Sequence, residues 1–420
     1  MNNEPLTLEK IYAAQKTISP YIPQTPLTRS FYLSGKYGLN VYLKMENLNL
    51  SGSFKIRGAT NALLCADQEH IQQKGVLAIS AGNHAQGVAR TANILGVKAT
   101  IFMPKQAPLV KIDSTRNLGA EVILAGESYD EAEKAASDWN KQHGAFLVHP
   151  FSDTNVIAGQ ATTALEICEQ LKNEEIGAVV TPIGGGGLAS GVACAIKSIS
   201  PKTQVIGAQS QLFSSVKDRF TGSTQKREHH PGVASLADGI AVKGVSEFTY
   251  SLISEYVDSI EAAEEDEIAA AIMELMERDH ILAEGAGAVS VAMLERLAPE
   301  LKAALGNKPV VCIVSGGNID VSLLNRITKK GLYHSGRIMR LSMSLPDRPG
   351  ALVNLLKKIS DTGANLYNIE HNRVFSGYGV KIVDVVVDLE TSGLTHQDEL
   401  ITKLSDCGYE VTSQRSFSVH

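Results

Sequence analysis

Short apolar segments alternate with longer amphipathic segments from residue 39 onward. The apolar segments lack the polar–apolar alternation of a one-sided sheet, and they cover residues 39–46, 75–80, 99–104, 120–125, 145–150, 178–184, 204–210 and 310–317. Such runs are typical of parallel strands with helices on both faces. Helical periodicity fills the intervals, most clearly at 83–96, 129–144 and 154–171. This order predicts an α/β protein with doubly wound, mostly parallel sheets in two lobes, the smaller at roughly 50–150.

The pattern changes near the C-terminus. Residues 326–337 are polar and rich in turn residues, which is typical of a linker. Beyond them the periodicity predicts one small βαββαβ domain over 338–420, with strands at 338–346, 364–374, 379–390 and 409–414 and helices at 350–363 and 396–406. Pro349 and Gly350 open the first of these helices, and Asp347 is a candidate cap. We therefore expect a main domain at 1–325, with a helix of acidic start at 261–278.

Composition narrows the class of protein. The chain of 420 residues is 44% hydrophobic and 20% charged, as in globular proteins, and its net charge of −6 provides no footprint for nucleic acid. Its five cysteines show no metal or disulfide spacing. The start lacks an apolar leader and no stretch is long enough to span a membrane, so a cytoplasmic location is expected.

Four consecutive glycines, Gly184 to Gly187, follow a strand-like segment and precede an Ala-rich helix. Such a run is costly in backbone entropy. At a strand-to-helix junction, however, its N–H groups can line an anion site with help from the helix dipole. The run therefore predicts a phosphate site, with a loose loop as the alternative. A dinucleotide site is disfavoured, although Gly184, Gly186 and Ala189 match G-x-G-x-x-A, because no acidic residue follows at the required strand end.

The segment ISAGNHAQGVA, 79–89, closes a strand and opens a helix. Ser80 or Asn83 would cap that helix in any protein. The small residues also leave N–H groups free beside the Asn83 amide, so the segment can hold a substrate carboxylate.

Lys55 lies in SGSFKIRGA, 51–59, between Phe54 and Arg57. A solvated charge is the simple alternative, since most lysines are exposed. A lysine desolvated in such a pocket has a lowered amine pKa and can form a Schiff base with an aldehyde. Ser315, in VSGGN at 314–318, follows the last strand of the main domain and alone indicates only a helix cap. Glu284 opens a helix of small residues, a pattern of close packing that can also place it near a ligand.

Together and in this order, these segments resemble the pyridoxal-phosphate enzymes of the tryptophan-synthase β fold (fold type II), specifically the threonine dehydratases (threonine ammonia-lyases). The resemblance covers residues 5–330. The tail, with LPDRPGAL at 345–352, resembles one ACT domain, a module that senses amino acids.

The resemblance implies a role for each matching residue. Lys55 would carry the cofactor, pyridoxal 5'-phosphate, in a Schiff base and serve as the catalytic base. Phe54 would lie beside the cofactor ring, Asn83 would hydrogen-bond its hydroxyl, and Ser315 would face its pyridine nitrogen. The cofactor phosphate would be bound by Gly184, Gly185, Gly186, Gly187 and Leu188. The substrate carboxylate would be held by Ser80, Ala81, Gly82, Asn83 and His84, although His84 could equally be structural.

The implied reaction converts L-threonine to 2-oxobutyrate and ammonia by α-proton abstraction and β-elimination, with L-serine to pyruvate as a secondary reaction. The ACT domain implies a homo-oligomer, a dimer or tetramer, regulated by an amino acid such as isoleucine or valine. Two alternatives stay open: a β-replacement enzyme of the same fold, similar to cysteine synthase, and a non-catalytic amino-acid sensor. Intact Lys55, Asn83 and Ser315 disfavour the sensor.

Two positions depart from close relatives. Serine racemases carry a second serine where this chain has Ala81, so we expect little racemisation. Gln209 stands where those relatives have the glutamate that leads a divalent-cation site, so we expect no metal there.

Overall fold

The computed structural model describes residues 4–223, 234–242, 244–373 and 381–414. By internal contacts the chain divides into two compact units, Met1–Asp320 and Val321–His420. The division falls close to the expected end of the main domain at residue 325. Within the described residues, no helix has both the length and the apolar character that crossing a membrane requires.

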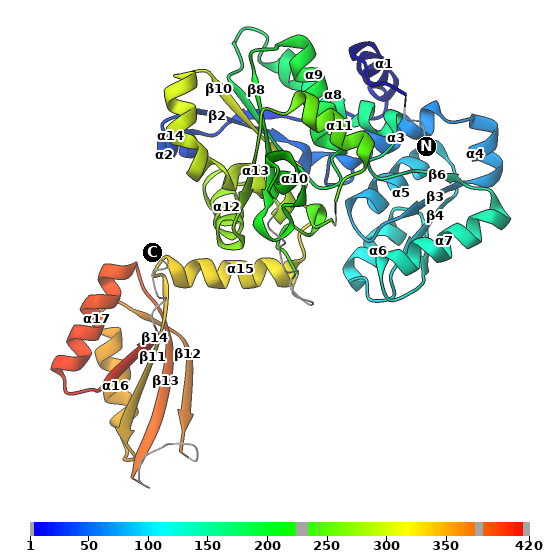
Figure 1. Cartoon of the computed structure of the whole chain (residues 1–420). Coiled ribbons are helices and arrows are strands. Elements are labelled where there is room, and N and C mark those ends of the chain that lie inside the picture. The colour runs from blue at the N-terminus through cyan, green and yellow to red at the C-terminus, as the bar shows by residue number, and fades with distance from the viewer. Residues whose placement is uncertain (1–3, 224–233, 243, 374–380, 415–420) are drawn as a thin grey trace. The chain divides into compact units, whose positions relative to one another are not determined.

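The first unit contains a six-stranded sheet that is parallel except for its first edge strand (Figure 1). In spatial order its strands are β1 (Leu27–Arg29), β2 (Asn40–Met45), β10 (Pro309–Val314), β7 (Ala178–Pro182), β8 (Gln204–Ser210) and β9 (Ser259–Ala263). Helices α8 (Thr154–Gln170) and α9 (Gly187–Ile199) share one apolar cluster with these strands. Helix α13 (Gly285–Ala292) contacts β7, β8 and β10 without entering that cluster, so both faces of the sheet are covered.

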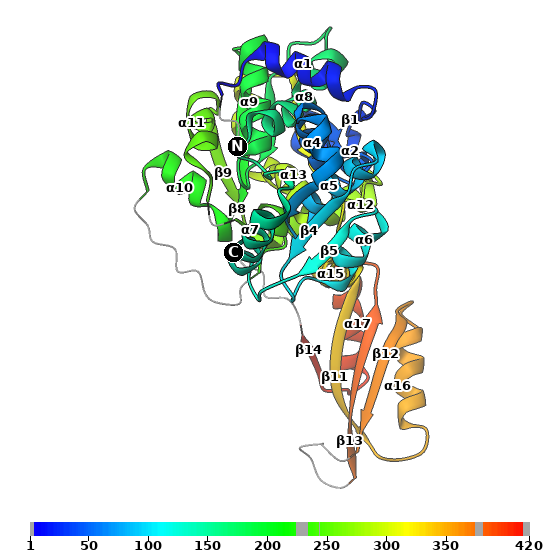
Figure 2. The same cartoon turned by 90° about the vertical axis from the view of Figure 1, so that its right-hand side faces the viewer.

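A smaller sheet of four parallel strands makes the second lobe of this unit (Figure 2). Its order is β5 (Glu121–Leu124), β4 (Ala99–Met103), β3 (Val76–Ile79) and β6 (Phe146–Leu147). Val76 and Ala78 belong to a cluster with α3 (Lys55–Cys65), α5 (Asn83–Leu95) and α6 (Leu109–Asn117), whereas Leu77 and Ile79 belong to another with α7 (Tyr129–His143). Successive side chains of a strand point to opposite faces, so a doubly covered strand is apolar throughout.

The remaining helices of the unit lie around these two sheets. They are α1 (Leu8–Ile18), α2 (Phe31–Tyr37), α4 (Gln68–Lys74), α10 (Ser215–Thr221), α11 (Glu247–Tyr256), α12 (Glu265–Arg278) and α14 (Leu294–Leu305), with short 3-10 turns η1 (Glu46–Leu48), η2 (Gln211–Phe213) and η3 (Asp238–Ile240). The doubly wound, two-lobed α/β architecture is confirmed.

The second unit contains α15 (Val321–His334), followed by an antiparallel sheet with two further helices packed against it. Its strands lie in the order β12 (Asn365–Asn372), β13 (Ile382–Glu390), β11 (Ile338–Pro346) and β14 (Val411–Gln414). Helices α16 (Ala351–Ser360) and α17 (Leu394–Asp406) contribute Leu355, Ile359, Leu400 and Leu404 to its core. The element order after residue 337 is the expected βαββαβ; the turn expected at 375–379 lies outside the described residues.

Three local predictions were wrong. The linker expected at 326–337 is mostly helical, because it continues α15 (Val321–His334), whose Ile327 is buried. The helix expected from residue 261 begins at Glu265, since the preceding residues pair with β8 as β9. Asp347 does not cap α16; Gly350 is the N-cap residue, and Asp347 pairs with Arg373 at 3.2 Å.

Candidate active site

Lys55 begins α3 at the carboxyl edge of the large sheet. The chain before it runs along the end of β10, where Ser53 forms a β-bridge with Gly316 and the Phe54 N–H donates to the Ser315 carbonyl at 3.0 Å. In open α/β sheets, ligands bind outside the carboxyl ends of the strands. The fold therefore delivers the Lys55 side chain to the edge where a ligand is expected.

The Lys55 amine is held in a desolvated position. Its Nζ donates to the Pro150 carbonyl at 3.0 Å and lies 5.2 Å from the centre of the Phe54 ring. Burial lowers the pKa of Lys55 to about 8, and the Glu284 carboxylate opposes this effect. About a tenth of the amine is therefore the free, nucleophilic base at pH 7.

Residues 149–152 connect Lys55 to the glycine turn. The His149 Nδ1 accepts hydrogen bonds from the Phe151 N–H at 3.2 Å and from the Ser152 N–H at 2.8 Å, so its proton lies on Nε2. Burial, and then the charge of Lys55, lowers the pKa of His149 to about 4, which keeps this acceptor available. The turn fixes the Pro150 carbonyl toward Lys55 and places Phe151 against the glycines.

The glycine turn needs its glycines for two reasons. Gly186 has φ of +89°, a conformation that residues with a Cβ rarely adopt, and a Cβ on Gly185 would overlap the Phe151 ring. In the described part of the chain, nothing accepts a hydrogen bond from the N–H groups of Gly184 to Gly187, which open the 13-residue helix α9. A row of free amides at a helix N-terminus fits a phosphate. A cavity of about 510 Å³ opens beside Phe151, lined also by residues 244–248.

The loop at the start of α5 remains partly open. Ser80, Ala81, Gly82 and Asn83 are half-buried, and the Gly82 N–H donates to the Ser80 Oγ at 3.1 Å. His84 instead is buried, and its Nε2 lies 2.8 Å from the Val148 carbonyl. Burial, and then the charge of Lys55, lowers the pKa of His84 to about 3, so the ring is neutral. These contacts favour a structural role for the His84 imidazole.

Asn83 and Ser315 lie beside α13. The Asn83 Nδ2 donates to the Glu284 Oε1 at 2.5 Å, and its Oδ1 accepts from the Asn318 Nδ2 at 2.8 Å. The Ser315 hydroxyl is buried and donates to the Ala286 carbonyl at 3.1 Å. A hydroxyl has one proton but can rotate, so Ser315 can redirect it to a ligand nitrogen.

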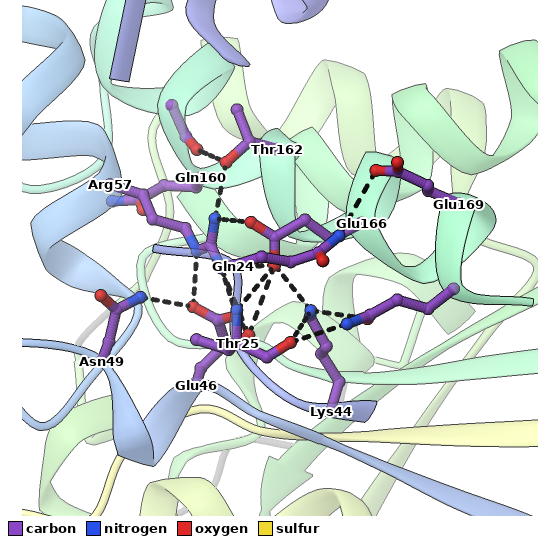
Figure 3. A network of polar contacts seen from close by, with 12 residues as sticks. Gln24, Thr25, Lys44, Glu46, Asn49, Arg57, Gln160, Thr162, Glu166 and Glu169 are labelled. Carbon is purple, nitrogen blue, oxygen red and sulfur yellow. Dashed lines mark hydrogen bonds and ion pairs between the residues drawn. The ribbon is translucent and has the colours of Figure 1, made fainter. Parts of the chain in front are cut away.

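Four buried charged side chains form a network that joins α3 to neighbouring elements (Figure 3). Arg57, two residues after Lys55, donates its Nε to Glu46 at 2.7 Å and its Nη1 to Glu166 at 2.6 Å. Lys44 pairs with the same Glu166 at 2.6 Å. All four side chains are at most 7% exposed, and their formal charges sum to zero.

This network ties three elements together: β2 with its following turn η1, α3, and α8. Burial alone would raise the pKa of Glu46, but Arg57 and Lys44 hold it below its ordinary value. Removing one partner of a buried pair is costly because the other charge is left uncompensated. We infer that the network fixes the start of α3, and hence Lys55, on the large lobe.

Gln209 has its polar groups satisfied by the protein itself. Its Nε2 donates to the carbonyls of Ile183 and Phe213 at 3.3 and 3.2 Å, and its Oε1 accepts from the Lys217 N–H at 2.9 Å. An amide nitrogen thus occupies the space between two carbonyls. Within the described residues, no group of three or more His, Cys, Asp or Glu side chains is arranged to hold a metal.

The structure places Lys55, the glycine turn and Ser315 at strand ends of the large sheet, and the loop of Ser80 to His84 after β3 of the small sheet. Lys55 and the glycine turn meet through residues 149–152, and Asn83 and the 315–318 loop meet at Glu284. Sequence reasoning missed His149, Phe151 and Asn318. A buried amine, free amides at a helix start and an amide donor together fit the aldehyde, phosphate and ring oxygen of pyridoxal phosphate.

Comparison with known proteins agrees with this geometry. Residues 18–316 match the family model described as pyridoxal-phosphate dependent enzyme. The chain is 46% identical over 407 residues to the L-threonine ammonia-lyase of Thermotoga maritima, covering 97% of this chain and 99% of that protein. The processed form of threonine deaminase isoform 2 from Solanum lycopersicum is 35% identical with a TM-score of 0.70, covering 78% of this chain and 91% of that one. A maize serine racemase is 30% identical with a TM-score of 0.71, covering 79% and 99%. This chain belongs to the pyridoxal-phosphate-dependent enzyme family.

Proposed function

We propose that this protein is an ammonia-lyase that converts L-threonine to 2-oxobutyrate and ammonia, with L-serine as a secondary substrate that gives pyruvate. The observation that supports this proposal most directly is the desolvated amine of Lys55, which residues 149–152 connect to the free amides of the glycine turn. The near full-length similarity to a protein named L-threonine ammonia-lyase supports the substrate.

Pyridoxal phosphate, when bound, supplies the electron sink that lets the α-carbon of an amino acid carry negative charge. Lys55 would hold it covalently, Phe54 would lie beside its ring, and the backbone of residues 184–188 would bind its phosphate. Asn83 would donate to its ring oxygen, and Ser315 would face its ring nitrogen. These five assignments follow the resemblance, and the contacts described above support them at Lys55, Asn83, Ser315 and the glycine turn.

Lys55 would also act as the base that removes the α-proton of the substrate. An amine whose pKa burial lowers to about 8 has a free-base fraction near neutral pH, as general base catalysis requires. The backbone of residues 80–84 would bind the substrate carboxylate and orient the Cα–H bond toward this amine. Loss of the α-proton and the β-hydroxyl removes water; hydrolysis then returns water and releases ammonia and the keto acid.

Keto-acid release tests the reaction most simply. Purified protein with L-threonine and no added nucleophile is expected to form 2-oxobutyrate and ammonia in equal amounts. A β-replacement enzyme would need a nucleophile such as sulfide, and a sensor would release no keto acid from either substrate. Lys55→Ala is the matched control and is expected to abolish release.

Racemisation is the second activity to consider because of the similarity to a serine racemase. Two-base racemisation needs a base on each face of the α-carbon, and the Ala81 methyl cannot accept a proton. We propose that D-serine is at most a trace product. Chiral analysis after incubation with L-serine would overturn this if D-serine accumulated in amounts comparable to pyruvate.

The second unit is proposed to be an ACT domain that binds an amino-acid effector, isoleucine or valine, in a homo-oligomer, dimer or tetramer. Its element order and sheet support this assignment. Removing residues 338–420 is expected to abolish the response of threonine turnover to the effector and to retain basal turnover. An unchanged response in the shortened protein would refute the regulatory proposal. The cytoplasmic location stays a prediction.

A further inference from the structure

The carboxyl group of Glu284 lies in a slot shaped for it. Glu284 is 5% exposed, and its backbone N–H donates to the Gly316 carbonyl at 3.0 Å. A Cβ on Gly316 would overlap Oε1, and one on Gly239 would lie 3.6 Å from it. Glu284 is the N-cap residue of α13, yet its side chain makes no capping hydrogen bond to that helix. The carboxylate is therefore directed away from its own helix, toward Asn83.

The orientation of the Asn83 amide follows from a chain of hydrogen bonds that begins at a backbone carbonyl. The Ser51 carbonyl can only accept, so the Asn318 group 2.9 Å from it must be the nitrogen. That same nitrogen lies 2.8 Å from the Asn83 side chain, which must present its oxygen there. The Asn83 nitrogen therefore faces Glu284, and within the described residues its second hydrogen has no acceptor.

We propose that Glu284 is a positioning residue that locks the Asn83 amide so that it presents an N–H, never its oxygen, to the ring oxygen of the bound cofactor. This rests on the proposed function. Asn318 holds the oxygen end of this amide and Glu284 holds its nitrogen end. Without the carboxylate only the bond from Asn318 restrains the amide, so its N–H is no longer held in line with the ring oxygen. Glu284 touches neither cofactor nor substrate in this account; it acts through Asn83.

Charged groups from three other elements face Glu284. Burial, and then the charge of Asp238 in η3, raises the pKa of Glu284 to about 7, and the charge of Lys111 in α6 opposes this. Lys111 and Asp238 form an ion pair with each other, so their effects on Glu284 have opposite signs. The charge of Glu284 raises the pKa of Lys55 in α3. A carboxyl group keeps a carbonyl oxygen when protonated, so it can accept from Asn83 in both states.

The test is a double-mutant cycle on cofactor affinity, measured by equilibrium dialysis of the holoenzyme against graded pyridoxal phosphate. Glu284→Ala is expected to raise the dissociation constant about tenfold, the size of one lost hydrogen bond to a ligand, and to shift the absorbance maximum of the bound cofactor. Glu284→Gln keeps an acceptor and is expected to stay within about threefold of wild type. Ser290→Ala, on the same helix, is the control and is expected to change neither readout.

The cycle separates a positioning role from a structural one. In an Asn83→Ala background, Glu284→Ala is expected to cause no further loss, because the amide that it orients is gone. An equal tenfold loss in both backgrounds would overturn the inference. If Glu284→Ala does not fold, Glu284→Asp serves instead, since Asp favours the N-cap position but is too short to reach Asn83. A wild-type protein that binds no cofactor would refute the proposed function itself.

Discussion

The ionisation of Lys55 in cofactor-free protein offers a quantitative test of the site. With a pKa of about 8, about a tenth of the amine is neutral at pH 7. An ordinary lysine, with a pKa of about 10.4, is neutral in about one molecule in 2,500. Lys55 should therefore be about 200-fold richer in its reactive form. Glu284→Gln should lower the midpoint further, because the carboxylate charge raises the pKa of Lys55.

Competitive acetylation with a small anhydride, read by peptide mass spectrometry from pH 6 to pH 11, measures this midpoint. Lys141, whose side chain is 72% exposed, is the internal reference. Partial shielding of Lys55 changes the height of its curve and leaves the midpoint unchanged, and circular dichroism verifies that the stripped protein is folded. A wild-type midpoint near 10.4, or an upward shift in the variant, would refute the argument that burial activates this amine.

Three further substitutions test the surroundings of the site. Gly185→Ala forces a methyl group into an aromatic ring and should destabilise the protein by about 1–3 kcal/mol, whereas Gly35→Ala meets open space and should be harmless in thermal unfolding. Arg57→Met leaves Glu46 without its ion pair, since Lys44 still pairs with Glu166, and should lower the free energy of unfolding by about 3–5 kcal/mol. Lys141→Met, at an exposed pair, should be nearly neutral, and equal losses would contradict the network's role. Gln209→Glu replaces a hydrogen-bonded amide by a carboxylate that faces two carbonyls, so the melting temperature of the variant should fall. Added Mg²⁺ should raise the melting temperature of the variant again and leave that of the wild type unchanged.

The apolar runs predicted the parallel strands well because those strands are buried on both faces. Val76–Ile79 is buried throughout, and its residues divide between two clusters. The same reasoning missed β9, because its Glu and Ala residues favour helices and only pairing with β8 makes them a strand. It also read residues 326–337 as a linker, because polar and turn residues fill the second half of α15.

In the site, too, features set by neighbouring residues could be predicted and contacts between distant segments could not. The desolvation of Lys55 and the free amides of the glycine turn could be predicted because each follows from a short contiguous segment. The contact of Phe151 with Gly185 joins segments with no shared pattern, and so do the bonds from Asn318 to Asn83. A signal did exist for the charge network. Lys44 is a charge inside an apolar strand, and such a residue needs a buried partner.

Borohydride reduction of the holoenzyme followed by peptide mapping tests the central claim most directly. Reduction fixes any link between pyridoxal phosphate and an amine as a stable secondary amine that survives digestion. The account predicts one modified peptide, with the added mass on Lys55, and a loss of the cofactor's colour. A modification at another lysine, with the residue 55 peptide unmodified, would contradict it.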